Sequence, residues 1–296
     1  MVVRKLRRAG GADVAPVTAA VVAATVAVTG LGGCAGAADA PPAGAVVASG
    51  RPVSDGAGQG RAGGRGAEAV RAAADALARA GTSKARTSME MTTGGTRLTV
   101  RGEGGYDFRA RRGRVQVLLP EDAGRPQRRI TEVFTPGALY MKNRGAGVPA
   151  DKWVRVDTAT LPDGNLVTGG ATDPAAAAEL LRAARQVALV GPASVGGVPV
   201  THYRGTTDIG AAAKTASPQV RGALAAAAKG FATDAVAFDA YLDDEGRLRK
   251  VRHRFRFANG AGEVGVESTT ELYDFGTPVG VRLPPSRDIY AGRIEG

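Results

Sequence analysis

The side chains that most often carry enzyme chemistry are scarce in this sequence of 296 residues. There are two histidines, His202 and His253, and one cysteine, Cys34. Neither histidine stands at metal-ligand spacing from a second His or Cys, and no nucleophile elbow, P-loop or HExxH motif is present. His202 lies in a strand-like stretch, which favours a structural role over a chemical one. The sequence therefore predicts a protein that is not an enzyme and that uses no metal or other cofactor.

Two further patterns have simpler structural interpretations. Asp243, Asp244 and Glu245 come just before Gly246, and strand-like stretches flank them, so a tight turn is favoured, with a calcium site as the alternative. Residues 58–63 match the GxGxxG pattern of dinucleotide-binding sites. Such a site needs a strand before the glycines. No strand is predicted there, and we assign no nucleotide site.

The single cysteine lies at the end of an N-terminal leader. Four basic residues occur among the first eight, and residues 14–28 are almost wholly apolar. A basic start followed by an apolar core of ~7–15 residues is typical of a secretory signal peptide. The next four residues, Leu31-Gly32-Gly33-Cys34, resemble the lipobox of bacterial lipoproteins. By that resemblance residues 1–33 are a signal peptide, and Cys34 becomes an acylated N-terminus with palmitate-type chains. The alternative is an ordinary signal peptide with an incidental cysteine.

An acylated Cys34 predicts the location of the protein. Each buried methylene contributes ~0.8 kcal/mol, so two or three acyl chains anchor firmly where one does not. We expect a lipid-anchored protein on the extracytoplasmic face of the cell membrane. Residues 34–66 are then the acylated cysteine and a tether of Ala, Gly and Pro with too few large apolar residues to fold. Residues 67–296 are left as one folded domain.

Apolar periodicity predicts an α+β domain. Residues 68–80 have helical spacing, and Asp173-Pro174 and Ser217-Pro218 each look like a cap followed by proline at the start of a helix. From residue 84 the period is two, which indicates antiparallel strands. The strand-like stretches are residues 89–91, 98–100, 115–119, 130–134, 139–141, 153–156, 198–208, 236–242, 247–257, 263–273 and 279–283. The first inserted helix is expected to run to residue 186, and the sheet to have about ten strands.

A basic run, RLRKVRHRFRF at residues 247–257, carries six Lys or Arg in a chain whose formal net charge is +11. Such a run also suggests nucleic acid binding. The following strand argues against it, because pairing Ala258 with Glu263 places Arg254 opposite Glu267 and Lys250 opposite a further glutamate. Cross-strand pairs of opposite charge contribute ~0.2–1 kcal/mol each. We therefore expect a partly neutralised solvent face whose excess positive charge favours contact with anionic lipid head groups, and no nucleic acid partner.

The order of these stretches resembles the LppX/LprAFG lipoprotein family, whose fold is LolA-like. The resemblance covers residues 67–286 and rests on GALYMKN, DKWVRVD, the helix at Asp173-Pro174, VGGVPVTHYRGTTD, AYLDDEGRLRKVRHRF and LYDFGTPVGVRLPP. It implies a curved antiparallel half-barrel sheet with helices closing its concave face. It also implies a carrier of acylated lipids or glycolipids rather than an enzyme. The implied ligand is an acylated lipid, and a membrane transporter is a candidate partner.

Ten apolar residues are candidates for lining a lipid cavity, because each alternates with more polar neighbours on its strand. They are Met89, Met91, Leu98, Val100, Val117, Leu119, Phe238, Leu242, Phe255 and Val266. The same alternation describes a solid core. The alternative function is therefore an envelope scaffold or sensor lipoprotein that carries no lipid and docks a membrane or protein partner through its basic face.

Overall fold

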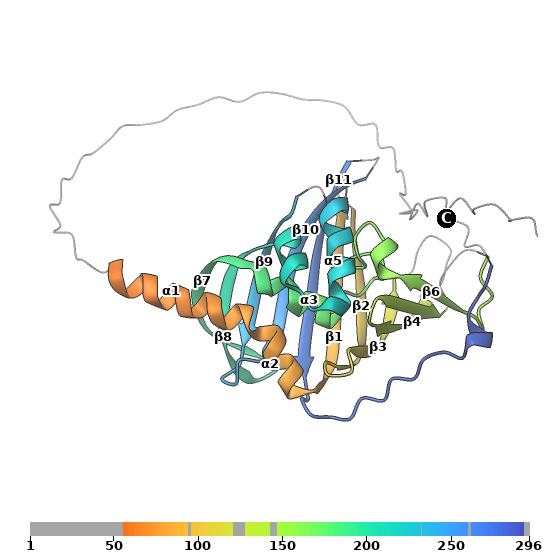
Figure 1. Ribbon diagram of the computed structural model, residues 1–296, viewed down its shortest axis with the longest axis horizontal. Helices are drawn as coiled ribbons and strands as arrows, with labels where there is room; N and C mark the ends of the chain where they lie inside the picture. The colour runs from red at the N-terminus through yellow and green to blue at the C-terminus, as the bar shows by residue number, and fades with distance from the viewer. Residues whose placement is uncertain are drawn as a thin grey trace, which may run out of the picture.

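The computed structural model describes residues 56–93, 96–120, 128–142, 147–231, 233–259 and 262–292 (Figure 1). The predicted signal peptide, Cys34 and the tether up to residue 55 lie outside the described residues. The described helices are α1 (Gly56–Arg71), α2 (Ala73–Ala80), α3 (Pro174–Leu180), α4 (Ile209–Thr215) and α5 (Pro218–Gly230), with short 3-10 turns η1 (Thr158–Thr160), η2 (Leu181–Ala183) and η3 (Ser286–Asp288). None of these helices is long and apolar enough to cross a membrane.

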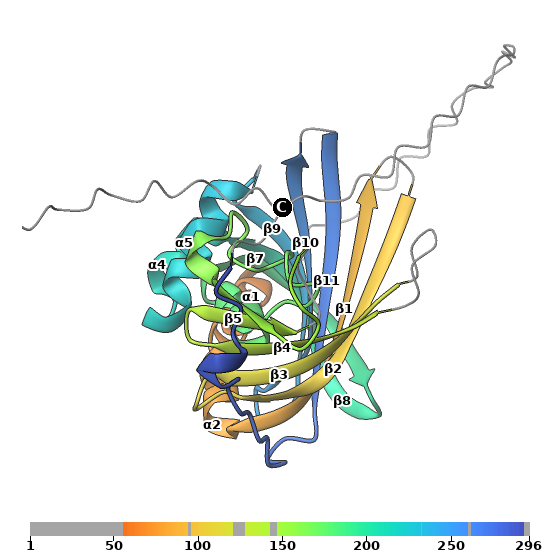
Figure 2. The same cartoon turned by 90° about the vertical axis from the view of Figure 1, so that its right-hand side faces the viewer.

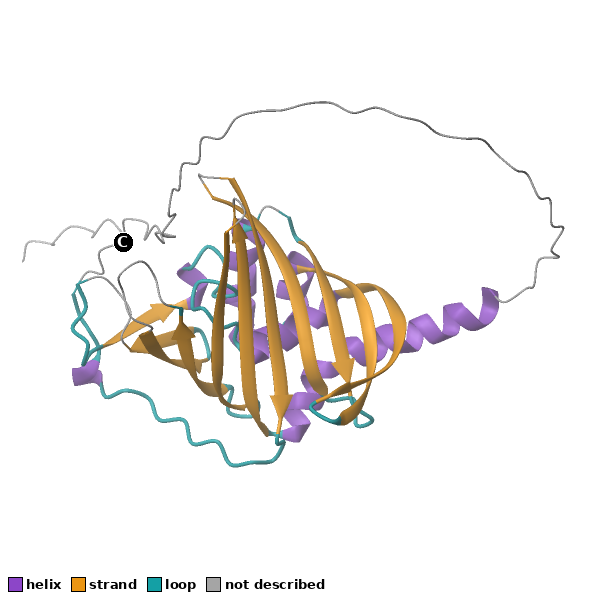
Figure 3. Ribbon diagram, turned by 180° about the vertical axis from the view of Figure 1, so that it is seen from behind, coloured by secondary structure: helices purple, strands orange, loops and turns teal. Residues whose placement is uncertain are grey.

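One antiparallel sheet of 11 strands forms the body of the molecule, in the order β6-β5-β4-β3-β2-β1-β11-β10-β9-β8-β7. Its strands are β1 (Thr82–Thr93), β2 (Thr96–Asp107), β3 (Arg112–Leu119), β4 (Arg128–Thr135), β5 (Ala138–Lys142), β6 (Trp153–Asp157), β7 (Ala184–Val195), β8 (Val198–Asp208), β9 (Ala235–Leu242), β10 (Leu248–Asn259) and β11 (Gly262–Tyr273). The sheet curves around the helices, which lie on its concave side (Figures 2 and 3). The predicted fold class, a curved half-barrel with helices on its concave face, is confirmed.

Two long connections lie on the concave side, and the strand order requires only the first of them. Strands β1 to β6 and β7 to β11 form two meanders, which join where β1 pairs with β11. Strands β6 and β7 therefore lie at opposite edges, and residues 158–183 connect them across the sheet. We call this segment the crossover. A second connection, with α4 and α5, joins β8 to β9. We call the sheet face under these connections the inner face.

The predicted register of the last hairpin is confirmed. Ala258 pairs with Glu263, Arg254 with Glu267 and Lys250 with Glu271. Arg254 Nε donates to Glu267 Oε2 at 3.1 Å, and Lys250 Nζ to Glu271 Oε1 at 2.8 Å. Pairing continues one step further than expected, to Asn259 with Gly262. The alternation also puts Phe255 on the inner face, where it is 1% exposed.

The helix predicted up to residue 186 ends earlier. Asp173 caps α3 by accepting from the Ala175 amide at 2.8 Å, as expected, but α3 and η2 stop at Ala183. Strand β7 begins at Ala184 and pairs with β8, with bulges on the way. Tertiary pairing with β8 thus overrides the helical spacing of this stretch. Ser217 and Pro218 begin α5 as expected, but the Ser217 side chain makes no capping hydrogen bond and instead accepts from Arg111 Nη1 at 2.5 Å.

Helix α1 begins at Gly56, well before the predicted start at residue 68. Its contact with the β7–β8 edge explains how a glycine-rich stretch is held. Gly66 is buried, and a Cβ at this position would lie 2.9 Å from Cε1 of Tyr203. Arg71 donates from Nε and Nη2 to the Ala184 carbonyl at 3.0 and 2.8 Å. The end of the expected tether, at Gly66, is thus packed against β8.

The C-terminal stretch is extended but is not the strand predicted at residues 279–283. It runs past the end of the sheet to β6 (Figure 1). There Ile289 forms a parallel bridge with Trp153, and the Tyr290 amide donates to the Trp153 carbonyl at 2.8 Å. The chain reaches the free side of the edge strand β6 only at Ile289, and residues 279–283 pair with no strand.

The opposite face of the sheet, which we call the outer face, is turned away from the connections. Substitutions on β3 test directly which side chains point to each face. Val115 is 0% exposed on the inner face, and its neighbour Gln116 is exposed on the other. Val115→Asn should lower the free energy of unfolding by about 2–4 kcal/mol because it buries an amide among apolar groups. Gln116→Asn should change it by less than about 0.5 kcal/mol. Urea unfolding of both variants makes the comparison, and equal losses would show that β3 is not oriented as described.

Candidate functional site

Strand register brings the ten candidate lining residues onto one face of the sheet. Met89 pairs with Val100 on β2, and Val266 on β11 pairs with both Met91 and Phe255. Because side chains alternate along a strand, these pairings place the whole set on the inner face.

Burial differs within the set. Seven members are at most 3% exposed, namely Met89, Val100, Val117, Phe238, Leu242, Phe255 and Val266. Met91 and Leu119 are partly buried against the same core, whereas Leu98 is 42% exposed. The inner face therefore supplies a wide, mainly apolar floor, with Leu98 at its margin. Their role in binding lipid stays a prediction.

The crossover lies directly on this floor. Leu166 and Ala171 are 0% exposed, and a Cβ on Gly169 would lie 3.2 Å from Glu132 Oε1 on β4. Thr172 Oγ1 lies 2.6 Å from Ser268 Oγ on β11. Since Thr172 already donates to the Leu166 carbonyl, Ser268 is the donor in that bond. In this structure the crossover fills the concave side with its own atoms.

The crossover loop is folded around one carboxylate. Asp163 accepts from the amides of Asn165, Val167 and Thr168 at 3.1, 2.8 and 2.6 Å, and from the Thr168 hydroxyl at 2.9 Å. The loop thus has its own internal hydrogen bonds, which do not depend on the sheet.

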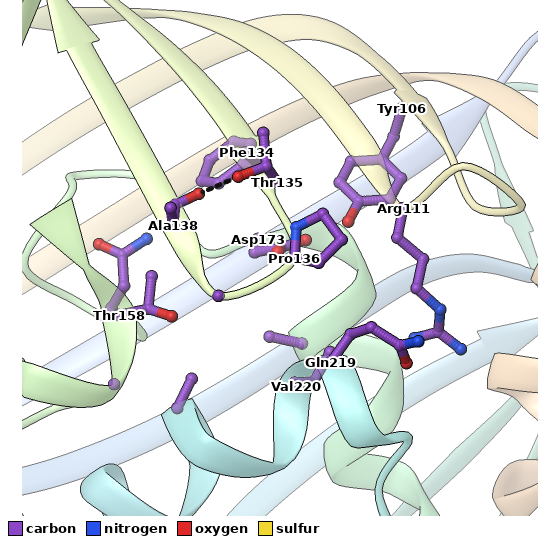
Figure 4. Close-up of a pocket in the computed structure, with 15 residues that line it drawn as sticks. Tyr106, Arg111, Phe134, Thr135, Pro136, Ala138, Thr158, Asp173, Gln219 and Val220 are labelled. Carbon is purple, nitrogen blue, oxygen red and sulfur yellow. Dashed lines mark hydrogen bonds between the residues drawn. The ribbon is translucent and has the colours of Figure 1, made fainter. Parts of the chain in front are cut away.

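A small pocket lies where the crossover meets β2, β4 and α5 (Figure 4). Its volume is about 20 Å³, enough for roughly one water molecule. Tyr106, Asp173 and Gln219 contribute polar groups to its wall, and Arg111 lies beside them. Removal from water raises the pKa of Asp173 to about 6, against the opposing effect of hydrogen bonds from Ala175 and Tyr106.

A second, open depression of about 370 Å³ lies at the surface, between η1 and α5. Small residues line it, including Ala159, Gly222 and Ala225. None of the ten candidate residues lines either pocket. Lipid binding on the inner face therefore requires the crossover to move.

The inner face also carries polar atoms that periodicity alone does not explain. His253 Nε2 and both polar side-chain atoms of Asn165 are buried without a hydrogen-bond partner. His253 is 1% exposed, and burial lowers its pKa to about 3. The sequence register already placed His253 opposite Ser268, but it gave no sign that the crossover would cover them.

On the outer face, one carboxylate organises the charges. Asp239 on β9 accepts from His202 Nε2, Arg204 Nε and Arg254 Nη2 at 2.8, 3.0 and 2.9 Å. Burial by itself raises the pKa of Asp239, but these hydrogen bonds lower it below its ordinary value. The Tyr241 ring stacks on His202 at 4.3 Å. This is the structural role expected of His202, and Asp239 is a centre that the sequence did not reveal.

The acidic turn also has its expected form. The Asp243 carboxylate accepts from the amides of Glu245 and Arg247 at 3.2 and 2.9 Å, and from Arg247 Nε at 2.9 Å. These bonds close the turn between β9 and β10. Among the described residues, no group of His, Cys, Asp and Glu has the arrangement of a metal site.

Comparison with known proteins gives structural matches alone. No family model matches the chain, and no curated protein does. The lipoprotein LppX of Mycobacterium tuberculosis matches with a TM-score of 0.44 and 10% identity, over 74% of this chain and 99% of that one. LprF of Mycobacterium bovis matches with a TM-score of 0.39 and 10% identity, over 75% of this chain and 97% of that one.

The raised pKa of Asp173 predicts a pH-dependent effect of Asp173→Asn. A carboxyl whose folded pKa is about 6, above its ordinary 3.8, stabilises the fold most below pH 4, and that contribution is lost as the pH rises through 6. Asparagine can still cap α3. The stability of the variant relative to the unchanged protein should therefore rise by about 1–3 kcal/mol between pH 4.5 and 8. Urea unfolding at both pH values measures it, and a constant difference would contradict the assignment.

Proposed function

We propose that this protein is an envelope lipoprotein that binds acylated lipids between the inner face of its sheet and the crossover, and carries them. The observation that supports this most is the nature of the cover. A wide apolar floor on β1–β3 and β9–β11 lies under a thin layer of short helices and loop. We propose a binding and carrying role, not an enzymatic one.

The crossover is built unevenly, which indicates how it opens. Near its end, Arg182 joins Glu179 and Asp75 of α2 through contacts of 2.6 Å each. This ion-paired end is the fixed part. Residues 161–172 hold to the sheet by the Thr172–Ser268 hydrogen bond and by apolar contacts. Lipid entry displaces this half, and the internal bonds of Asp163 let the loop keep its shape.

The free-energy cost of exposing the loop can be compared with the gain from burying an acyl chain in its place. Exposing Leu166 and Val167 costs about 1.5–3 kcal/mol for each side chain. An acyl chain gains ~0.8 kcal/mol for each methylene that it buries. For a lipid met in water, about ten methylenes therefore outweigh the exposed loop, while the sheet residues stay covered. For a lipid drawn from a membrane, whose chains are already buried, this gain largely cancels, and specific contacts in the site must offset the displacement of the loop. Met89 and Met91 suit such a floor, because flexible thioethers adapt to chains of different shape.

The location and partners belong to the same proposal. Acylated Cys34 holds the protein on the extracytoplasmic face of the cell membrane. The lipid comes from that membrane or from a membrane transporter, and basic residues of the outer face meet anionic head groups.

One observation favours a second candidate function. The concave side is filled by the crossover, as expected for a scaffold or sensor lipoprotein with a solid core. In that case the outer face, whose arginines are held by Asp239 and Glu267, is the surface for a partner. The two functions differ in whether the crossover must move.

A disulfide across the crossover tests the carrier function. In a full chain with Cys34→Ala, Thr172→Cys and Ser268→Cys would be the only cysteines. Incubation with phosphatidylcholine vesicles that contain dioleoylglycerol, followed by native mass spectrometry, measures lipid uptake. The oxidised variant should take up at least tenfold less lipid than the reduced one, because the loop cannot leave the floor.

The matched control is a Lys250→Cys, Glu271→Cys pair, which joins cross-strand neighbours on the outer face. Its uptake should be the same oxidised and reduced. Equal uptake by the oxidised and reduced Thr172–Ser268 variant would exclude binding under the crossover. Absence of lipid from the unlocked chain would leave the scaffold function.

The anchor has a separate test. Cys34→Ala should abolish acylation and leave unprocessed precursor, because the thiol accepts the diacylglycerol. Labelling with a fatty-acid probe and detergent partitioning measure this. A variant that still incorporates the probe and still partitions into detergent would show that Cys34 is not the anchor.

A further inference from the structure

Buried polar residues interrupt the apolar floor of the inner face, among them Thr87, His253, Ser268 and Thr270. His253 on β10 and Ser268 on β11 are direct cross-strand partners, so their Cβ atoms lie about 4.5–5.5 Å apart. They are 1% and 4% exposed. Both lie near the centre of the sheet, under the crossover.

His253 has an unsatisfied hydrogen-bonding atom in apolar surroundings. Among the described residues its Nε2 has no hydrogen-bond partner. The ring centroids of Phe255 and Phe238 lie 5.8 and 6.5 Å from the centroid of the His253 ring. Burial lowers the pKa of His253 to about 3, so the imidazole is neutral near pH 7 and offers one donor and one acceptor. A buried polar atom without a partner is destabilising. A core that served packing alone would be more stable with an apolar residue here.

Ser268 has a partner only while the crossover is in place. Its hydroxyl donates to Thr172 Oγ1, at 2.6 Å. When residues 161–172 move away, Ser268 loses that acceptor. The opened floor then presents a hydroxyl and a neutral imidazole side by side, surrounded by apolar side chains.

We propose that His253 and Ser268 form a polar subsite for an uncharged hydrogen-bond acceptor of the bound lipid, an ester carbonyl at the junction of its acyl chains. This inference rests on the proposed carrier function and names its ligand class, acylglycerol-like esters. An anionic phosphate does not fit, because a neutral imidazole and a hydroxyl cannot compensate a buried charge. The arginines of the same strand, Arg252 and Arg254, pair with Glu267 on the outer face.

The test compares an ester with an ether. The full chain with Cys34→Ala is incubated with phosphatidylcholine vesicles that contain equal amounts of dioleoylglycerol and its dioleyl ether analogue, which lacks the carbonyls. Native mass spectrometry gives the ratio of the two bound lipids. The ester should be bound about 5–10-fold in excess of the ether. His253→Phe should bring the ratio close to one while the ether is still bound.

A second substitution keeps the test valid if His253→Phe misfolds. Ser268→Ala should lower the ester preference at least twofold, and Thr269→Ala, the neighbour on the outer face, should leave it unchanged. The same preference in the unchanged chain, His253→Phe and Ser268→Ala would overturn the subsite but not the carrier function. Uptake of neither lipid by the unchanged chain would overturn both.

Discussion

The structure depends on one topological constraint, the crossing of the chain from β6 at one edge of the sheet to β7 at the other. This connection must traverse the whole concave side, because β1 and β11 join the two meanders in the middle. Residues 158–183 therefore lie where a ligand of the inner face would lie. The same segment stabilises the closed fold, by burying Leu166 and Ala171, and decides whether the floor is open.

Polar groups on the two faces of the sheet obtain their hydrogen-bond partners in different ways. On the outer face, charges are met in place, with Asp239 bonded to His202, Arg204 and Arg254. On the inner face, polar groups lie among apolar side chains. The crossover supplies the partner of Ser268, and His253 Nε2 has no hydrogen-bond partner among the described residues. Unmet buried polar atoms are costly in a purely structural core. Their position under a displaceable segment is what the carrier proposal explains and a solid scaffold does not.

Much of the fold could be predicted from the sequence, because a period of two and complementary charges fix register. The pairing of Arg254 with Glu267 and the inward position of Phe255 follow from that pattern. Strand β7 could not be predicted, since residues 180–187 have helical spacing and pair with β8 only through tertiary contact. The crossover loop has no periodic pattern of apolar residues. Residues 279–283 alternate like a strand but pair with no strand in the structure. For the candidate site, the apolar floor was predictable, but its cover and the Asp239 centre depend on contacts between distant segments.

The central claim is that lipid replaces the crossover on the inner face. A crystal structure of the full chain with Cys34→Ala, solved with dioleoylglycerol bound, tests it most directly. The claim predicts acyl chains along Met89, Val117 and Phe255, with the Thr172–Ser268 hydrogen bond broken and the Arg182 contacts kept. Lipid bound on the outer face, or on a protein whose Thr172–Ser268 bond is intact, would contradict it.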